Sequence, residues 1–136
     1  MKRVRGYIFS RPFMGERVPQ HVQNLVIRDY CERTHLHFLL SATEYVMTDC
    51  YLMLQEILDQ ITNLHGIVAY SLFQLPENIY IREKIYQEII SKKRYLYFAV
   101  EGMSAHTVRD FERIETIWRV RQTLPHCPNV EISNHV

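Results

Sequence analysis

Four side chains suited to acid–base, nucleophilic or anion-binding chemistry fall within eight positions near the start of the sequence: Ser10, Arg11, Glu16 and Arg17. They follow an apolar stretch, residues 4–10, that is typical of a short β-strand. They precede Pro19, which suits the first turn of a helix because its missing N–H costs nothing there. A strand, a charged loop and a helix start together favour anion binding. We therefore expect Arg11 and Arg17 to hold a phosphate or carboxylate, unless they pair with nearby carboxylates.

Ser10 is a candidate nucleophile, a candidate hydrogen-bond donor to a ligand, or a cap for its own loop. A nucleophilic serine needs a base within hydrogen-bond reach. The sequence offers His21 and His106 for that role, and the spacing fixes neither of them beside the serine.

Two glutamates follow predicted strands closely, where an acid–base group would be useful. Glu44 comes after the apolar residues 37–40, and Glu101 comes after residues 95–100. Each could act as a general acid or base if burial raised its pKa. The alternative is a structural carboxylate, since ion pairs within the fold resemble functional ones.

Strand-like and helix-like stretches alternate along the whole chain. The expected strands are residues 4–10, 37–40, 67–72 and 95–100, and the expected helices are residues 18–33, 49–64, 79–92 and 107–123. This order predicts one α/β domain over residues 1–124, with a mostly parallel sheet of four or five strands flanked by helices. Residues 125–136 are expected to form a tail or an edge strand.

In such a sheet, ligands bind beyond the carboxyl ends of the strands. The loops expected there are residues 10–18, 41–48, 71–78 and 101–107. They would bring together the candidate catalytic residues Ser10, Glu44 and Glu101 and the candidate binding residues Arg11, Arg17, Tyr45, Ser71 and Gln74. Gln20 and Asn24, on the first helix, are expected to help orient ligand hydroxyls.

Composition narrows the classes of partner. The net charge is +1, from 16 basic and 15 acidic residues, which argues against nucleic-acid binding. No apolar run approaches the roughly 20 residues of a membrane span.

The three cysteines do not form a disulfide framework, which favours a cytoplasmic location. Neither a metal-binding pattern nor a glycine-rich phosphate loop is present in the sequence, so no metal and no cofactor is expected.

The last expected helix carries more apolar side chains than one stripe needs: Phe111, Ile114, Ile117, Trp118 and Val120. This excess predicts a homo-oligomer interface in addition to packing on the sheet. The alternative is two-sided packing within one chain.

Part of the chain resembles the catalytic domain of serine recombinases, the resolvases and invertases. The resemblance rests on Gly6-Tyr7, Ser10, Gln23, Tyr30-Cys31, residues 68–72 and 74–78, and the stretch from Tyr95 into Glu101. It implies that the sheet is either flavodoxin-like or resolvase-like. The arginine that precedes a recombinase serine by two residues would fall on Ile8. The acidic residue and the two arginines that follow the third strand would fall on Phe73, Gln74 and Glu77, so these charged residues are missing.

The whole chain is more similar to a small bacterial family of sporadically distributed carbohydrate-biosynthesis clusters. The matching stretches are residues 7–20, 42–45 and 70–76. This resemblance implies a cytoplasmic protein that binds a phosphorylated, nucleotide-linked or acidic sugar, and it leaves open whether the protein is an enzyme. The alternative function is a non-catalytic oligomeric scaffold, or a regulatory partner of a glycan-biosynthesis enzyme.

Overall fold

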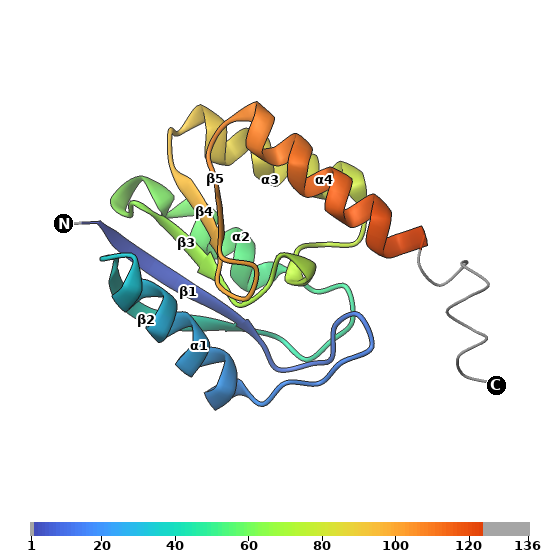
Figure 1. Cartoon of the computed structure of the whole chain (residues 1–136), viewed down its shortest axis with the longest axis horizontal. Coiled ribbons are helices and arrows are strands. Elements are labelled where there is room, and N and C mark those ends of the chain that lie inside the picture. Colours follow the sequence, from blue (N-terminus) through green and yellow to red (C-terminus); the bar gives the residue numbers. More distant parts are fainter. Residues whose placement is uncertain (1, 124–136) are drawn as a thin grey trace.

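The apolar stretches of the sequence assemble into one five-stranded sheet, in the order β2-β1-β3-β4-β5 (Figure 1). The computed structural model describes residues 2–123. The strands are β1 (Arg3–Phe9), β2 (His37–Glu44), β3 (Gly66–Ala69), β4 (Tyr95–Phe98) and β5 (Met103–Ala105). The first four are parallel, and β5 pairs antiparallel with β4. The predicted single α/β domain with a mostly parallel sheet is therefore confirmed.

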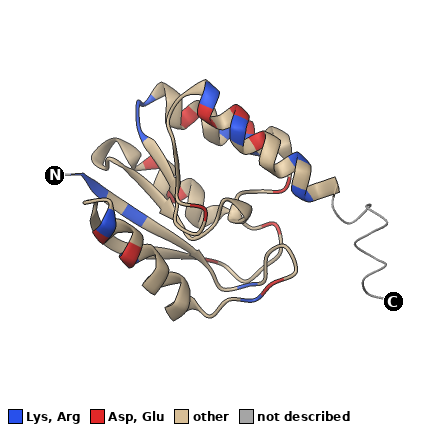
Figure 2. Ribbon diagram, in the orientation of Figure 1, with Lys and Arg blue, Asp and Glu red and all other residues tan. Residues whose placement is uncertain are grey.

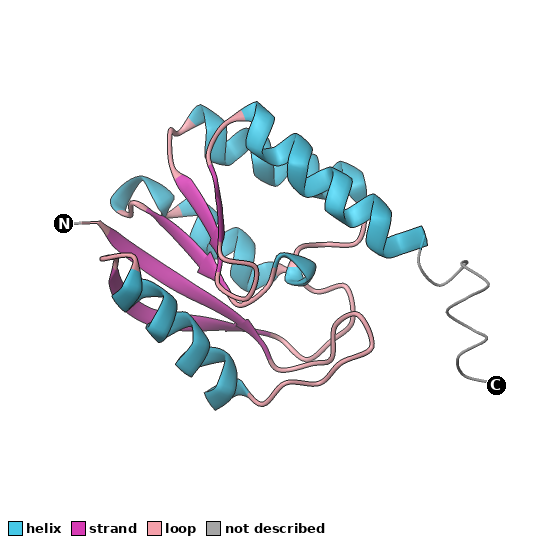
Figure 3. Ribbon diagram, in the orientation of Figure 1, coloured by secondary structure: helices cyan, strands magenta, loops and turns pink. Residues whose placement is uncertain are grey.

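Helices cover the two faces of the sheet unequally (Figure 3). One face packs on α1 (Gln20–Arg33), and the other on α2 (Leu52–Asp59), α3 (Ile79–Ser91) and α4 (Val108–Thr123). Two short 3₁₀ turns, η1 (Ile61–Asn63) and η2 (Leu72–Gln74), complete the elements. Alternate side chains of β1 enter the two cores: Tyr7 and Phe9 face α2, whereas Val4 and Ile8 face α1.

Several predicted boundaries were wrong. Residues 41–44, predicted as loop, continue β2, because β1 is long enough to pair with them up to Glu44. The helix predicted over residues 49–64 forms only over Leu52–Asp59, since Asp49 has a positive φ of 60° and η1 follows. The strand predicted over residues 67–72 gives way to η2 after Ala69. The sequence analysis missed β5, whose three residues are too few to show a strand periodicity. The predicted tail at residues 125–136 lies outside the described residues.

Gly66 is required by the close approach of β3 and β4. A Cβ at this position would lie 2.3 Å from the carbonyl oxygen of Tyr95. Only glycine fits there without moving the backbone of the partner strand.

A buried ion pair locks α3 against α4. Arg82 donates from Nε and Nη2 to the Glu115 carboxylate, at 2.8 and 2.7 Å, and from Nη1 to the carbonyls of Pro76 and Glu77. The Tyr86 hydroxyl donates to the same carboxylate. Burial raises the pKa of Glu115, but the hydrogen bonds from Arg82 and Tyr86 outweigh burial, and the net effect is a pKa below the ordinary value.

Glu115→Gln should therefore destabilise the fold in a pH-dependent way. A carboxyl group with a lowered folded pKa contributes stability above its unfolded pKa, near 4.5, and this contribution is lost as the pH falls through the folded pKa. We expect the variant to lose about 3 kcal/mol of the free energy of unfolding at pH 7, because Arg82 stays buried without its partner. Urea unfolding at pH 7 and pH 3 measures this, and the gap between variant and wild type should shrink at pH 3. Glu112→Gln, one turn earlier and exposed, is the control. An equal gap at both pH values would contradict the ion-pair account.

Candidate functional site

A cavity of about 440 Å³ opens beyond the carboxyl ends of the strands, where the sequence predicted a site. We call it the carboxyl-edge pocket. Four aromatic residues line it: Phe9, Phe13, Tyr51 and Phe73. Its charged lining residues are of both signs: Arg11, Arg17, Asp49 and Glu77. Figure 2 shows basic and acidic segments together in the loops at this end of the sheet.

Arg11 is the central structural residue of the pocket wall. Its guanidinium packs against two rings, 4.2 Å from the centroid of Phe9 and 5.0 Å from that of Tyr51. Nη1 donates to the carbonyls of Tyr45 and Cys50, at 2.8 and 3.1 Å. Nη2 is buried and has no hydrogen-bond partner in the described structure. Arg11 therefore fastens the loop after β2 to the end of β1.

Arg17 is the accessible cation of the site. Its side chain is exposed, and it lines both the carboxyl-edge pocket and an adjoining cavity of about 370 Å³ that Ser10 and Gln20 also line. Within residues 2–123, its guanidinium makes neither a hydrogen bond nor an ion pair. The alternative in which Glu16 neutralises Arg11 and Arg17 is therefore absent from the described structure.

Glu44 is buried and serves as an anchor. Its carboxylate accepts hydrogen bonds from the Tyr7 hydroxyl at 2.8 Å and from the backbone N–H groups of Tyr45, Met53 and Leu54 at 3.1–3.2 Å. Two of those N–H groups belong to the first turn of α2, whose own N-cap, Tyr51, supplies no side-chain hydrogen bond. Burial first, and then the charge of Glu44, raise the pKa of Tyr7. Both carboxylate oxygens of Glu44 accept hydrogen bonds that join β1, β2 and α2. Its acid–base role stays a prediction.

Ser71 and Glu101 form a second anchor. The Ser71 hydroxyl donates to Glu101 at 2.8 Å, and the carboxylate also accepts from the N–H of Leu72 at 3.1 Å. The Ser71 oxygen in turn accepts from the N–H of Phe73 and so begins η2. Ser10 behaves similarly, since its hydroxyl donates to the Glu44 carbonyl at 2.9 Å. The catalytic roles predicted for Ser10 and Glu101 are not tested by these contacts.

Gln23 joins the loops after β1 and β3, a role that the sequence analysis missed. Its side chain is fully buried and bonds to both backbone groups of Phe9 and to the carbonyl of Val18. Its Oε1 also accepts from Nε2 of Gln74 at 2.8 Å. Gln74 is consequently buried in this network, and its own Oε1 has no partner in the described residues.

The remaining predicted residues lie apart from the pocket wall. Asn24 accepts a hydrogen bond from Ser41, at 2.6 Å, on the α1 face of the sheet. Tyr45 keeps a half-exposed ring, and its carbonyl receives Arg11. The aromatic rings and the carboxylates of Asp49 and Glu77 were not predicted as site residues. The loops at this edge were expected to meet, but which of their side chains enter the pocket depends on the fold.

A tight turn forms the outer edge of the pocket. Phe13 and Glu16 exchange two backbone hydrogen bonds of 2.9 Å around Met14 and Gly15, whose φ angles are 49° and 79°. Two central residues with positive φ are the pattern of a type I′ hairpin turn, which glycine fits well and methionine poorly. The turn carries Phe13 to the pocket, where its ring meets Phe9 edge-on at 5.7 Å.

Two solved structures share this fold. One is a resolvase family site-specific recombinase from Streptococcus pneumoniae, with a TM-score of 0.64 and 8% identity over 97% of this chain and 93% of that one. The other is the N-terminal catalytic domain of TP901-1 integrase, with a TM-score of 0.57 and 15% identity over 90% of this chain and 96% of that one. No family model and no curated protein sequence matches the chain. At these identities the likeness shows the fold alone, so the resolvase-like fold is confirmed.

Residues 2–123 contain no group of three side chains placed to bind a metal ion. Among those residues, no helix is long and apolar enough to span a bilayer.

Glu44→Gln tests the anchor directly. An amide keeps one acceptor but turns its NH₂ toward backbone donors, so we expect a loss of about 1–3 kcal/mol in the free energy of unfolding. Chemical denaturation measures the loss. Glu56→Gln, an exposed residue of α2, should stay within about 0.5 kcal/mol of wild type. Equal stability of the two variants would show that Glu44 does not hold α2.

Proposed function

We propose that the carboxyl-edge pocket binds an anionic sugar, either phosphorylated, nucleotide-linked or acidic, in the cytoplasm. The observation that carries the proposal is the free Arg17 guanidinium at a pocket with aromatic walls and unpaired carboxylates. Arg17 would bind the phosphate or carboxylate through its paired donors. The resemblance of residues 7–20 to the carbohydrate-biosynthesis family supports the same class of ligand.

The acidic residues favour a sugar over a simple anion. Asp49 and Glu77 form no ion pair with Arg11 or Arg17 within the described chain, although all four line one pocket. Two carboxylates repel an inorganic anion, but they accept hydrogen bonds from hydroxyl groups. A sugar that bears an acid group would bind the arginine through that group and the two carboxylates through its hydroxyl groups.

The aromatic walls fit the body of such a ligand. Phe13 and Phe73 are partly buried and pack against the core, so their rings are held in place by the fold. Rigid rings offer the apolar faces of a sugar ring a surface at little cost in conformational entropy. Asp49 has a φ of 60°, a conformation that costs energy and is often found at functional sites.

Arg17→Met is the decisive variant for anion binding. We expect glucose 1-phosphate, UDP-glucose or glucuronic acid to raise the melting temperature of the wild-type protein, and calorimetry to give the affinity of whichever does so. Loss of the charged hydrogen bonds should weaken that affinity roughly tenfold or more in Arg17→Met. Arg113→Met, on the exposed surface of α4, should bind as wild type does. Equal binding by both variants, or no shift with any of the three ligands, would contradict the proposal.

Asp49→Asn combined with Glu77→Gln separates a sugar site from an anion site. Asparagine tolerates a positive φ, so the backbone at position 49 should be kept. We expect the double variant to bind the sugar phosphate more weakly, because hydroxyl acceptors are lost. Inorganic phosphate should bind equally well or more tightly, because repulsion is reduced. If both ligands gain affinity alike, the carboxylates do not contact a sugar.

A further inference from the structure

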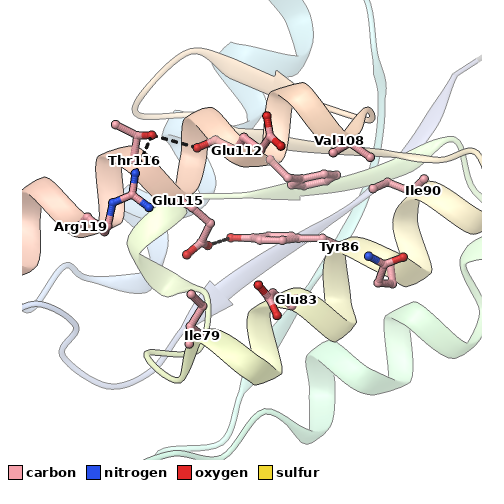
Figure 4. A pocket seen from close by; sticks show the side chains of 11 residues that line it. Ile79, Glu83, Tyr86, Ile90, Val108, Glu112, Glu115, Thr116 and Arg119 are labelled. Carbon is pink, nitrogen blue, oxygen red and sulfur yellow. Dashed lines mark hydrogen bonds between the residues drawn. The ribbon is translucent and has the colours of Figure 1, made fainter.

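A groove of about 600 Å³ lies between α3 and α4, away from the carboxyl-edge pocket (Figure 4). We call it the α3–α4 groove. Its floor is the stacked pair Tyr86 and Phe111, whose ring centroids lie 4.3 Å apart. None of its lining residues lines the carboxyl-edge pocket. Whatever binds here would therefore do so at a separate surface.

The two helices run antiparallel along the groove, since Arg82 meets Glu115 and Tyr86 meets Phe111. Apolar side chains consequently mark its two ends. Ile79 lies at one end, and Ile90 lies with Val108 at the other. Ile79 and Val108 are 41% and 59% exposed, which leaves apolar surface open to a partner. Along α3 the two isoleucines are about 16 Å apart, or three helical turns.

The middle of the groove is acidic. Glu83, on α3, and Glu112, on α4, face it from opposite walls (Figure 4). In residues 2–123, neither carboxylate forms a hydrogen bond or an ion pair. Glu115 is neutralised by Arg82 behind it, and Arg119 sits at the Ile79 end, where it contacts Thr116 at 3.3 Å. Two free carboxylates therefore flank an apolar floor.

We infer that the α3–α4 groove docks a basic amphipathic helix of a partner protein. A helix that binds in a groove contacts it through apolar side chains at i, i+4, i+7 and i+11. The span of eleven residues matches the separation of Ile79 and Ile90 on α3. Lysine or arginine at its centre would meet Glu83 and Glu112, while the aliphatic stems cover the aromatic floor. The chain's own residues 124–136 contain neither lysine nor arginine, so they lack the required charge.

The test uses a labelled 15-residue helical peptide of alanine, with leucine at positions 2, 6, 9 and 13 and lysine at positions 5 and 10, which flank the leucine stripe on its two sides. A twin peptide carries glutamate in place of lysine. Fluorescence anisotropy with the wild-type protein should show binding of the basic peptide at least tenfold tighter than that of its acidic twin. The difference should decrease at high salt, because the charges are exposed.

Charge reversal locates the binding surface. Glu83→Lys with Glu112→Lys should weaken binding of the basic peptide tenfold or more. Glu32→Lys with Glu56→Lys makes the same change in net charge on α1 and α2, and should leave binding within twofold of wild type. All four residues are exposed, so both variants should fold, which circular dichroism checks.

Three results would overturn the inference. The first is equal binding of the two peptides, and the second is an equal loss in the two double variants. The third is a dimer of the wild-type protein in sedimentation that the Glu83→Lys, Glu112→Lys double variant does not form. A second copy of the chain would then occupy the groove. None of these results bears on sugar binding at the carboxyl-edge pocket.

Discussion

The buried carboxylate of Glu44 joins the sheet to the helix layer at the edge where the site lies. Glu44 is the last residue of β2. Its carboxylate accepts hydrogen bonds from the Tyr7 hydroxyl of β1 and from two free N–H groups in the first turn of α2. A buried carboxyl group is stable only when its hydrogen-bonding capacity is met, and the Tyr7 hydroxyl, the Cys50 thiol and three backbone N–H groups meet it here. The connection from β2 to α2 is thereby held at both of its ends.

Arg11 binds the segment between β2 and α2 and so shapes one wall of the pocket. Its guanidinium donates to the carbonyls of Tyr45 and Cys50 and packs against the rings of Phe9 and Tyr51. The loop consequently places Asp49 and Tyr51 opposite the segment that carries Arg17. Glu44 and Arg11 act as positioning residues. The groups accessible to a ligand are the side chains of the loop that they hold in place, together with Arg17. The α3–α4 groove depends on a different buried charge, Arg82, and is independent of this edge.

Much of the fold could be predicted from the sequence because its strands are short, apolar and separated by amphipathic helices. The strand–helix alternation was sufficient for the parallel sheet. The antiparallel β5 and the extension of β2 were not predictable, since both depend on pairing with a neighbour rather than on local pattern. The short α2 reflects the positive φ of Asp49 before it and the 3₁₀ turn η1 after it, neither of which a periodicity reveals.

The candidate site was predictable as a place but only partly as a set of side chains. Arg11 and Arg17 have the same residue type and lie in the same loop, yet one is buried against aromatic rings and the other is exposed. Burial of this kind depends on Tyr51, forty positions away, and cannot be inferred from local sequence. Gln23 was recognised in the resemblance to recombinases, whereas its role as a link between two loops required the fold.

An NMR titration of the protein with glucose 1-phosphate tests the central claim most directly, by following the arginine Nε–H signals. We expect the Arg17 signal to shift and reach saturation, together with the amides of residues 13–17, 46–51, 73–75 and 77. The Arg82 signal should stay unchanged, because its donors are already bound to Glu115. Shifts confined to other surfaces, with Arg17 unaffected, would contradict the assignment of the carboxyl-edge pocket as the ligand site.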